Sequence, residues 1–246
     1  SQGVPVYFQD MIPGQEITDA SLKELLDDLP WKHAADILRT ADVVAGMEGV
    51  YPVLVTSFCC SPDSFAAEYF KNLMNSRGKP YLILQLDEHD SNVGYETRIE
   101  AGLRSFSNHF LRRRFKSGAT LPSISPVKRI EDKTIVVPDW DRFSCSLLAA
   151  SLRKEGLDAR LMGQTGTQLQ RSLRHNTGEC IPVNVMAQGF MDYLTQNDLD
   201  PARCVLWIGN GEIPCNLKVI PHHIKNILNK SGPVMSRAQV YRGDIS

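Results

Sequence analysis

The sequence predicts an α/β fold made of two consecutive units, each with a mainly parallel sheet and helices on both faces. Short apolar runs rich in β-branched residues alternate with amphipathic stretches along most of the 246 residues. This alternation stops in residues 117–132, where Gly, Pro and Ser gather, and then begins again. We therefore expect a first α/β unit over residues 1–116, a linker over 117–132 and a second unit over 133–246.

In the first unit, apolar runs predict strands and amphipathic runs predict helices. The strands are expected at residues 4–8, 52–58 and 81–86, and the helices at 18–29, 30–47, 61–75 and 94–115. Local signals support these limits. Thr18 is a helix cap, Pro62 stands in a first helical turn, where its missing N–H costs nothing, and Gly78 follows the end of that helix.

The second unit repeats the pattern. Strands are expected at residues 134–137, 158–162 and 204–209, and helices at 143–155, 177–194 and 217–229. Gly156 ends the first of these helices, and Pro182 lies in the first turns of the second. His222 and His223 share the last helix with lysines, which predicts a solvated face. Because the chain begins with Ser rather than Met, we expect it to be a fragment of a longer protein, with the second unit truncated.

The composition excludes several classes of function. A net charge of -1 gives no support to nucleic-acid binding or to binding of an anionic membrane surface. No apolar run approaches the roughly 18 residues needed to cross a bilayer, and no signal peptide is present. P-loop, G-x-S-x-G and G-x-G-x-x-G motifs are also missing. These features predict a cytoplasmic protein, in which the six cysteines stay reduced and suit metal or redox chemistry.

Three cysteines stand where ligands collect in α/β folds. Cys60 follows a predicted strand and opens a helix, whose positive dipole end favours the thiolate. Cys215 lies in a loop beyond another strand, and Cys180 stands in the Thr-Gly-Glu-Cys-Ile-Pro segment. We expect these three thiols to share one crevice beyond the strand ends. Three thiolates suit an iron–sulfur cluster with one open iron, whereas three thiolates and a histidine, of which His175 is the nearest, would suit zinc.

The other cysteines are weaker candidates. Cys59 neighbours Cys60 and points to another side, so only one of the two is expected to bind a metal. Cys145 also follows a strand, but residues 144–150 have the pattern of a packing face. Cys204 opens its strand at the end opposite to Cys215, so we expect it to be a small buried apolar residue.

A polar segment follows the strand predicted at 81–86. Asp87, Glu88 and His89 would face the same crevice, where they could transfer protons or orient a ligand. The equally supported alternative is a polar loop in which Asp87 and Asp90 cap the neighbouring helix. The catalytic residues are therefore left open.

Three segments resemble a known family. They are S-F-C-C-S-P-D-S-F at 57–65, G-K-P-Y-L-I-L-Q-L-D-E-H-D-S-N-V-G-Y-E-T-R-I-E-A at 78–101 and T-G-E-C-I-P at 177–182. They resemble the activase-related domain of large 2-hydroxyacyl-CoA dehydratase activator-type proteins, which is similar to the Fe–S subunits of these dehydratases. The resemblance covers residues 51–228. It implies tandem Rossmann-like (flavodoxin-like) three-layer subdomains and a [4Fe–4S] cluster held by Cys60, Cys180 and Cys215.

The resemblance also implies partners and a reaction type. An ATP-hydrolysing activase domain or subunit would supply the electron, and an acyl-CoA would be the substrate. We therefore expect an Fe–S domain that transfers electrons at low potential, within a 2-hydroxyacyl-CoA dehydratase-type system. Two alternatives stay open: a non-catalytic α/β interaction or scaffold domain, and a zinc-binding domain.

Overall fold

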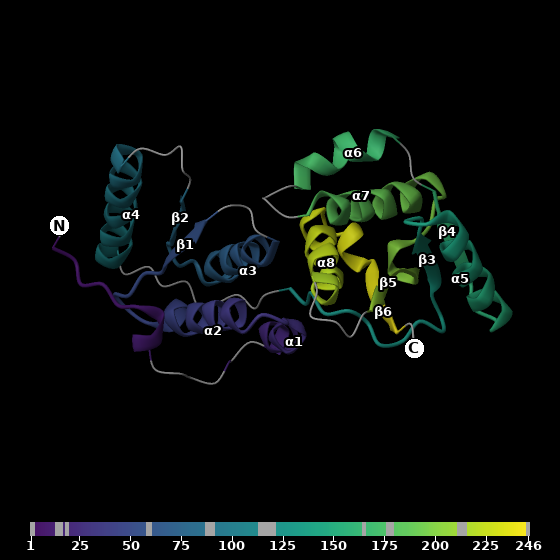
Figure 1. Cartoon of the computed structure of the whole chain (residues 1–246), viewed down its shortest axis with the longest axis horizontal. Helices are drawn as coiled ribbons and strands as arrows, with labels where there is room; N and C mark the ends of the chain where they lie inside the picture. Colours follow the sequence, from purple (N-terminus) through teal and green to yellow (C-terminus); the bar gives the residue numbers. More distant parts are fainter. Residues whose placement is uncertain are drawn as a thin grey trace. The chain divides into compact units, whose positions relative to one another are not determined.

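The fold is α/β with parallel sheets, as the sequence predicts (Figure 1). The computed structural model describes residues 3–12, 17, 20–57, 61–86, 92–112, 122–163, 166–175, 180–210 and 216–244. The chain divides into two compact units: residues Ser1–Leu26 with Trp31–Leu121, and residues Asp27–Pro30 with Pro122–Ser246. Each unit is described separately below.

The first unit contains a two-stranded parallel sheet and its helices. Strand β1 pairs with β2 so that Val53 stands opposite Leu82 and Ser57 opposite Leu86. Gly78 ends helix α3 with a φ of 63°, a conformation that glycine adopts without strain. The elements are η1 (Gln9–Met11), α1 (Ala20–Asp28), α2 (Lys32–Gly46), β1 (Val53–Ser57), α3 (Ser61–Arg77), β2 (Leu82–Leu86) and α4 (Asn92–Arg112).

The strand expected at residues 4–8 is wrong. These residues adopt no regular structure, and Val6, Tyr7 and Phe8 are all more than 60% exposed. The valines and aromatic residues of this segment favour a strand by their local propensity. A strand also needs a neighbour for its backbone hydrogen bonds and a face to bury, and no described strand pairs with this segment.

The second unit contains a four-stranded parallel sheet in the order β4-β3-β5-β6. Two of its elements, α6 and β6, were missing from the sequence prediction. The elements are β3 (Thr134–Pro138), α5 (Arg142–Lys154), β4 (Ala159–Met162), α6 (Gly166–Ser172), η2 (Leu173–His175), α7 (Ile181–Gln196), η3 (Pro201–Arg203), β5 (Cys204–Asn210), η4 (Asn216–Lys218), α8 (Ile220–Lys230), η5 (Met235–Arg237) and β6 (Gln239–Asp244).

Helices cover both faces of this sheet. On one face Val136 of β3 shares an apolar cluster with Phe190 of α7 and Ile224 of α8. On the other face Ile135 shares a cluster with Cys145 of α5. Because alternate residues of a strand point to opposite faces, β3 is buried on both sides. The second unit is therefore built as helix, sheet and helix layers (Figure 1).

Part of the segment expected to be a linker joins this sheet. The backbone N–H of Val127 donates to the carbonyl of Val240 at 2.8 Å, and Val127 forms an isolated parallel bridge with Tyr241. The pairing covers the edge of β6. Residues 113–121, where the expected linker begins, lie outside the described part of the chain.

The solvated face expected for the last helix is wrong. His222, His223 and Lys225 of α8 are each at most 5% exposed. The ammonium of Lys225 donates to the carbonyls of Ser236 and Ala238, both at 2.7 Å, and its burial lowers its pKa. A long amphipathic side chain thus satisfies two carbonyls just before β6, which sequence periodicity could not reveal.

His222 also has a specific partner. Its Nε2 donates to Oδ2 of Asp28 at 2.7 Å, and the guanidinium of Arg242 pairs with the other carboxylate oxygen. Burial alone would raise the pKa of Asp28, but the hydrogen bonds from His222 and Arg242 lower it. The carboxylate, imidazole and guanidinium form one polar cluster within the second unit.

Candidate functional site

The parallel strands of the second unit all end at one edge of the sheet, the carboxyl edge. The chain passes from β3 outward to β4, then returns across β3 to form β5 on its other side. Ligands of open parallel sheets bind where the strand order changes direction in this way. Here that point lies between β3 and β5. Helix α5 follows β3 directly and begins at this edge, and α7 leads through η3 to the start of β5, which places its N-terminus toward the carboxyl edge.

Cys180 stands at this edge. It is the N-cap of α7, its side chain makes no capping hydrogen bond, and its thiol is exposed. Its backbone carbonyl accepts from the N–H of Val183 at 3.0 Å, which fixes the start of the helix. Pro182 lies in the first turn, where a missing N–H is tolerated. The sequence therefore places an exposed free thiol at the N-terminus of a long helix.

Exposed apolar side chains mark the same edge. Trp140 and Phe143 stand at the start of α5, Ile181 begins α7, and Leu217 lies just beyond β5. Each is more than a third exposed, although large apolar residues usually lie inside. Exposed apolar residues at the ends of such elements are typical of a surface that a ligand or partner covers.

Helix α7 carries a stripe of buried polar residues on the C-terminal side of Cys180. Asn184, Gln188 and Asp192 follow it at intervals of four residues, and each is at most 5% exposed. Residues four apart lie on the same face of a helix. The stripe is unusual because buried polar groups cost free energy unless each has a hydrogen-bond partner. We did not anticipate it, although its spacing can be read from the sequence.

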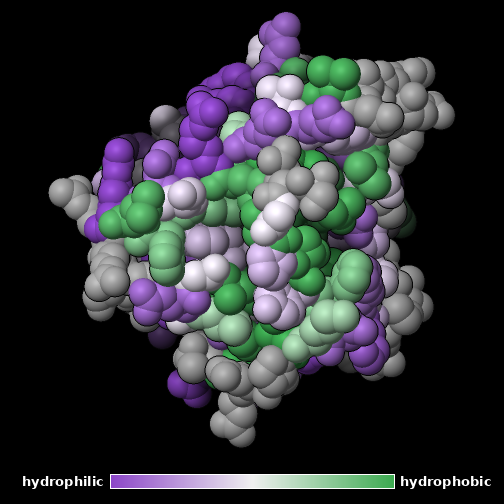
Figure 2. Space-filling view, turned by 90° about the vertical axis from the view of Figure 1, so that its left-hand side faces the viewer, coloured by the Kyte–Doolittle hydropathy of each residue, from purple (hydrophilic) through white to green (hydrophobic). Residues whose placement is uncertain are grey.

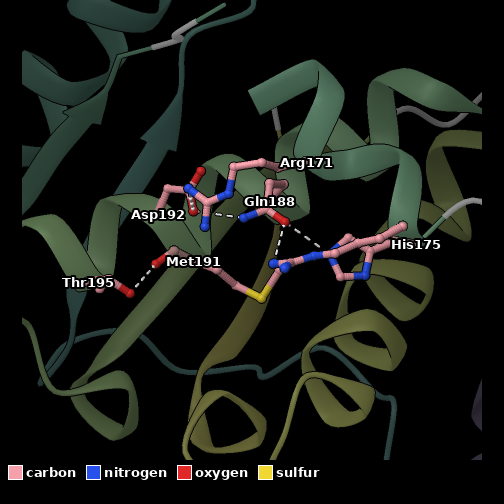
Figure 3. Close-up of polar contacts among 7 residues, drawn as sticks. Arg171, His175, Gln188, Met191, Asp192 and Thr195 are labelled. Carbon is pink, nitrogen blue, oxygen red and sulfur yellow. Dashed lines mark hydrogen bonds and ion pairs between the residues drawn. The ribbon is translucent and has the colours of Figure 1, made fainter. Parts of the chain in front are cut away.

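Gln188 and Asp192, the two C-terminal members of the stripe, form hydrogen bonds and an ion pair with one another and with neighbouring side chains (Figure 3). Gln188 Nε2 donates to Oδ1 of Asp192 at 2.7 Å, and the same oxygen pairs with the guanidinium of Arg171 at 2.9 Å. Gln188 Oε1 accepts from Arg174 at 2.9 Å and lies 3.1 Å from Nε2 of His175. Two arginines and a histidine from α6 and η2 thus hold the buried amide and carboxylate of α7.

Arg174 and Gln188 are hydrogen-bond partners of His175. Nε of Arg174 donates to Nε2 of His175 at 3.3 Å, and the same ring nitrogen lies 3.1 Å from Oε1 of Gln188 in a second hydrogen bond. Burial lowers the pKa of His175, against the effect of this hydrogen bond, and the charge of Arg174 lowers it further. Burial and the neighbouring guanidinium thus favour the neutral imidazole.

Asn184, the N-terminal member of the stripe, differs from the other two in its hydrogen bonding. Asn184 is 1% exposed, and within the described residues neither Oδ1 nor Nδ2 has a hydrogen-bond partner. Each unsatisfied buried polar group costs about 1–3 kcal/mol. Asn184 lies in the first turns of α7, four residues after Cys180.

Several predicted site residues lie outside the described part of the chain. Cys59 and Cys60 fall in residues 58–60, between β1 and α3, and Cys215 falls in residues 211–215, between β5 and η4. Asp87, Glu88 and His89 fall in residues 87–91, between β2 and α4. Within the residues that are described, no group of three or more His, Cys, Asp or Glu side chains could hold a metal.

The two remaining cysteines are buried. Cys145 packs against the sheet in a cluster with Ile135 and Trp207. Cys204 opens β5 and is 1% exposed, as expected for a small apolar core residue, and burial raises the pKa of its thiol. Of the described cysteines, Cys180 is the one that reaches solvent.

Comparison with known proteins identifies no relative: no family model, curated protein or solved structure matches the chain. The resemblance to dehydratase-related domains therefore rests on the quoted motifs and stays a prediction. In the described part of the chain, no helix is both long and apolar enough to cross a membrane.

Proposed function

We propose that the chain is an iron–sulfur domain in which Cys60, Cys180 and Cys215 hold a [4Fe–4S] cluster. One observation carries the proposal: the thiol of Cys180 is exposed at the N-terminus of α7, at the carboxyl edge of the sheet. Strand β5 ends at this edge and leads directly into the segment that contains Cys215. When bound, such a cluster would take up and pass single electrons at low potential.

The strand order of the second unit supports the part of the proposal that concerns Rossmann-like subdomains. The order β4-β3-β5-β6 is the flavodoxin-like order of a Rossmann-like sheet, with its ligand crevice between the first and third strands in sequence. We propose a second Rossmann-like subdomain in the first unit, where β1, α3 and β2 form a parallel strand-helix-strand unit. There Thr56 of β1 donates to Asp63 in the first turn of α3, which fixes the chain on either side of residues 58–60.

The proposed reaction and partners are those that the resemblance to dehydratase-related domains implies. The domain would act in the cytoplasm within a 2-hydroxyacyl-CoA dehydratase-type system, with an ATPase activase as electron donor and an acyl-CoA as substrate. Asp87, Glu88 and His89 would transfer protons near the cluster. The exposed apolar residues around Cys180 would limit the access of water.

Anaerobic reconstitution followed by iron and sulfide analysis tests the proposal. We expect about four irons and about four sulfides per chain. The Cys180→Ala variant should lose the cluster, and the matched Cys204→Ala variant, which removes a buried thiol, should keep it. Zinc without sulfide would replace the proposal with a zinc site, and a chain that binds no metal after reconstitution would refute both.

A second candidate function is that of an interaction domain. Figure 2 shows groups of hydrophobic residues, with pale residues between them, near the middle of the face drawn. Val53 and Val55 of β1 are each about half exposed and point to the same side of the sheet, and Leu111 of α4 is 73% exposed. Exposed apolar areas of this kind mark docking surfaces. Val55→Lys should then abolish binding of an activase partner in calorimetry, whereas Leu147→Lys in the second unit should not.

A further inference from the structure

We propose that a second copy of this chain docks on the outer face of α5, as an antiparallel helix pair related by a two-fold axis. The outer face consists of four exposed residues: Phe143, Leu147, Ala150 and Lys154. Phe143 is 74% exposed and Leu147 is 56% exposed, so the two large apolar side chains of this face lie in water. The inference does not depend on the proposed iron–sulfur function.

Helix α5 is apolar on two opposite sides. The side that packs on the sheet consists of Cys145, Leu148, Ala149 and Leu152. A surface helix usually has polar residues opposite its buried face. With 3.6 residues in each turn, however, the outer face lies directly opposite these four residues, and three of its own members are apolar. An apolar stripe that remains exposed is typical of a surface that a partner covers.

The spacing of the outer face is that of a coiled-coil seam. Its residues follow one another at intervals of four, three and four positions, the alternation that keeps an apolar stripe turned toward a neighbouring helix. The exposed residues beside this seam include Ser144, Ser146 and Ser151. Because the distance between packed helices depends on the size of the side chains at their contact, small flanking residues allow a second helix to approach closely. The face therefore fits another helix.

The sizes of the side chains favour a second copy in antiparallel orientation. The large residues, Phe143 and Leu147, lie in the N-terminal half of the outer face, and Ala150 and Lys154 lie in its C-terminal half. An antiparallel pair centred between Leu147 and Ala150 places each leucine against the alanine of the other copy. It also places each Phe143 against the aliphatic stem of the other Lys154. A parallel pair would align the alanines with one another and leave a void beside them.

The charges at the two ends of α5 favour the same orientation. Asp141 caps the N-terminus and Arg142 follows it, whereas Lys154 and Glu155 stand at the C-terminal end. In the antiparallel pair Arg142, which also pairs with Asp139 of its own chain at 3.3 Å, is level with Glu155 of the second copy. Asp141 then lies within one turn of Lys154 of that copy. A parallel pair would bring like charges together at both ends, which costs free energy.

The two-fold axis makes the contact self-limiting. The same patch serves both copies, so each outer face is covered once the pair has formed and no further copy can add to it. The expected assembly is a dimer rather than a filament. One helix pair is a small contact, so we expect the dimer to dissociate on dilution.

Sedimentation equilibrium of the full chain, under reducing conditions and over a series of concentrations, tests the proposal. Wild type should form a dimer. Leu147→Glu should raise the dissociation constant at least about 30-fold, because the substitution removes a central contact in both halves of the pair. Leu169→Glu is the matched control: Leu169 of α6 is 51% exposed in the same unit, and its replacement should leave the dissociation constant unchanged.

A mixing experiment tests the orientation. Ala150→Lys should also weaken the dimer, because its ammonium replaces a small apolar contact. An equimolar mixture of the Leu147→Glu and Ala150→Lys chains should form a heterodimer. In the antiparallel pair the introduced carboxylate is level with the introduced ammonium, and the other half of the contact keeps the natural leucine and alanine. A mixture that stays monomeric would overturn the antiparallel arrangement.

The remaining outcomes decide whether the outer face is an interface at all. A wild-type chain that is monomeric up to about 0.1 mM overturns the proposal. Dimers that survive Leu147→Glu, or that Leu169→Glu weakens equally, place the contact elsewhere and also overturn it. A monomeric chain whose urea midpoint falls in Leu147→Glu would show that another part of the same chain covers this face. Should Leu147→Glu fail to fold, Ala150→Lys tests the same face by the same measurement.

Discussion

Replacing Gln188 with leucine tests how the buried stripe of α7 is held. The substitution keeps the size of the side chain and removes one donor and one acceptor at a site that is 0% exposed. The donor serves the carboxylate of Asp192 at 2.7 Å, and the acceptor serves Arg174 and His175. After the change, Asp192 keeps only its ion pair with Arg171 among the partners described above.

The expected loss in free energy of unfolding depends on which former partners of Gln188 can form hydrogen bonds with water instead. Arg174 is exposed, so its lost hydrogen bond is replaced by solvent and contributes little. Asp192 is 5% exposed, and a hydrogen bond to a buried charged group contributes about 1.5–3 kcal/mol. The leucine regains part of this free energy because it buries no amide. We therefore expect Gln188→Leu to lower the free energy of unfolding by about 2 kcal/mol.

Urea denaturation followed by the fluorescence of Trp207, which is buried in the second unit, measures this change. Gln196→Leu is the matched control, because Gln196 is exposed on the same helix. Burial lowers the pKa of His175 and the hydrogen bond to Oε1 of Gln188 raises it, so loss of this bond should lower that pKa further in an NMR titration. A change in stability below about 0.5 kcal/mol, the usual range for surface substitutions, would refute the reasoning.

Two further predictions concern the second unit. In Gly243→Ala, the added Cβ would overlap the indole of buried Trp207, so we expect a loss of about 1–3 kcal/mol in urea denaturation. Gly163→Ala meets no atom within 4 Å and should show no comparable loss, and equal effects would argue against a steric cause. Hydrogen bonds lower the pKa of Asp28 from its ordinary value of 3.8, so its contribution to stability is present above that pH and is lost as the pH falls through the lowered value. Asp28→Asn should flatten this acid-side slope, whereas Asn in place of exposed Asp132 should leave it intact; two parallel slopes would contradict the assignment.

Much of the fold could be predicted because its strands are marked at both ends. Strands β1, β2, β3, β4 and β5 agree with the expected ranges to within a residue, since most of these apolar runs have proline, glycine or charged residues at their ends. Helix α6 was missed because it is short and its sequence, Gly-Thr-Gln-Leu-Gln-Arg-Ser, has no apolar stripe. Strand β6 was missed because its sequence, Gln-Val-Tyr-Arg-Gly-Asp, has no apolar run. It forms a strand by pairing with β5.

The candidate site could be predicted only in part. Pro182 indicates that a helix begins nearby, but the expected range of 177–194 placed Cys180 inside the helix, whereas it is the N-cap of α7. The partners of Gln188 come from residues 171–175, and no local pattern shows that this segment folds back against α7. Likewise, the burial of His222 depends on Asp28, far away in the sequence. Tertiary contacts of this kind decide which polar residues are buried, whatever their local propensity.

The order of the strands has a consequence for synthesis. Thr134 of β3 pairs with Cys204 of β5, so the central strand lacks one of its two neighbours until the ribosome has produced all of α6 and α7. At ordinary translation rates this delay is roughly 5 to 15 seconds. During that time a strand made of Ile135, Val136 and Val137 has an open edge, which is prone to aggregation. Expression of the chain should therefore benefit from slow growth and from chaperones that shield nascent strands.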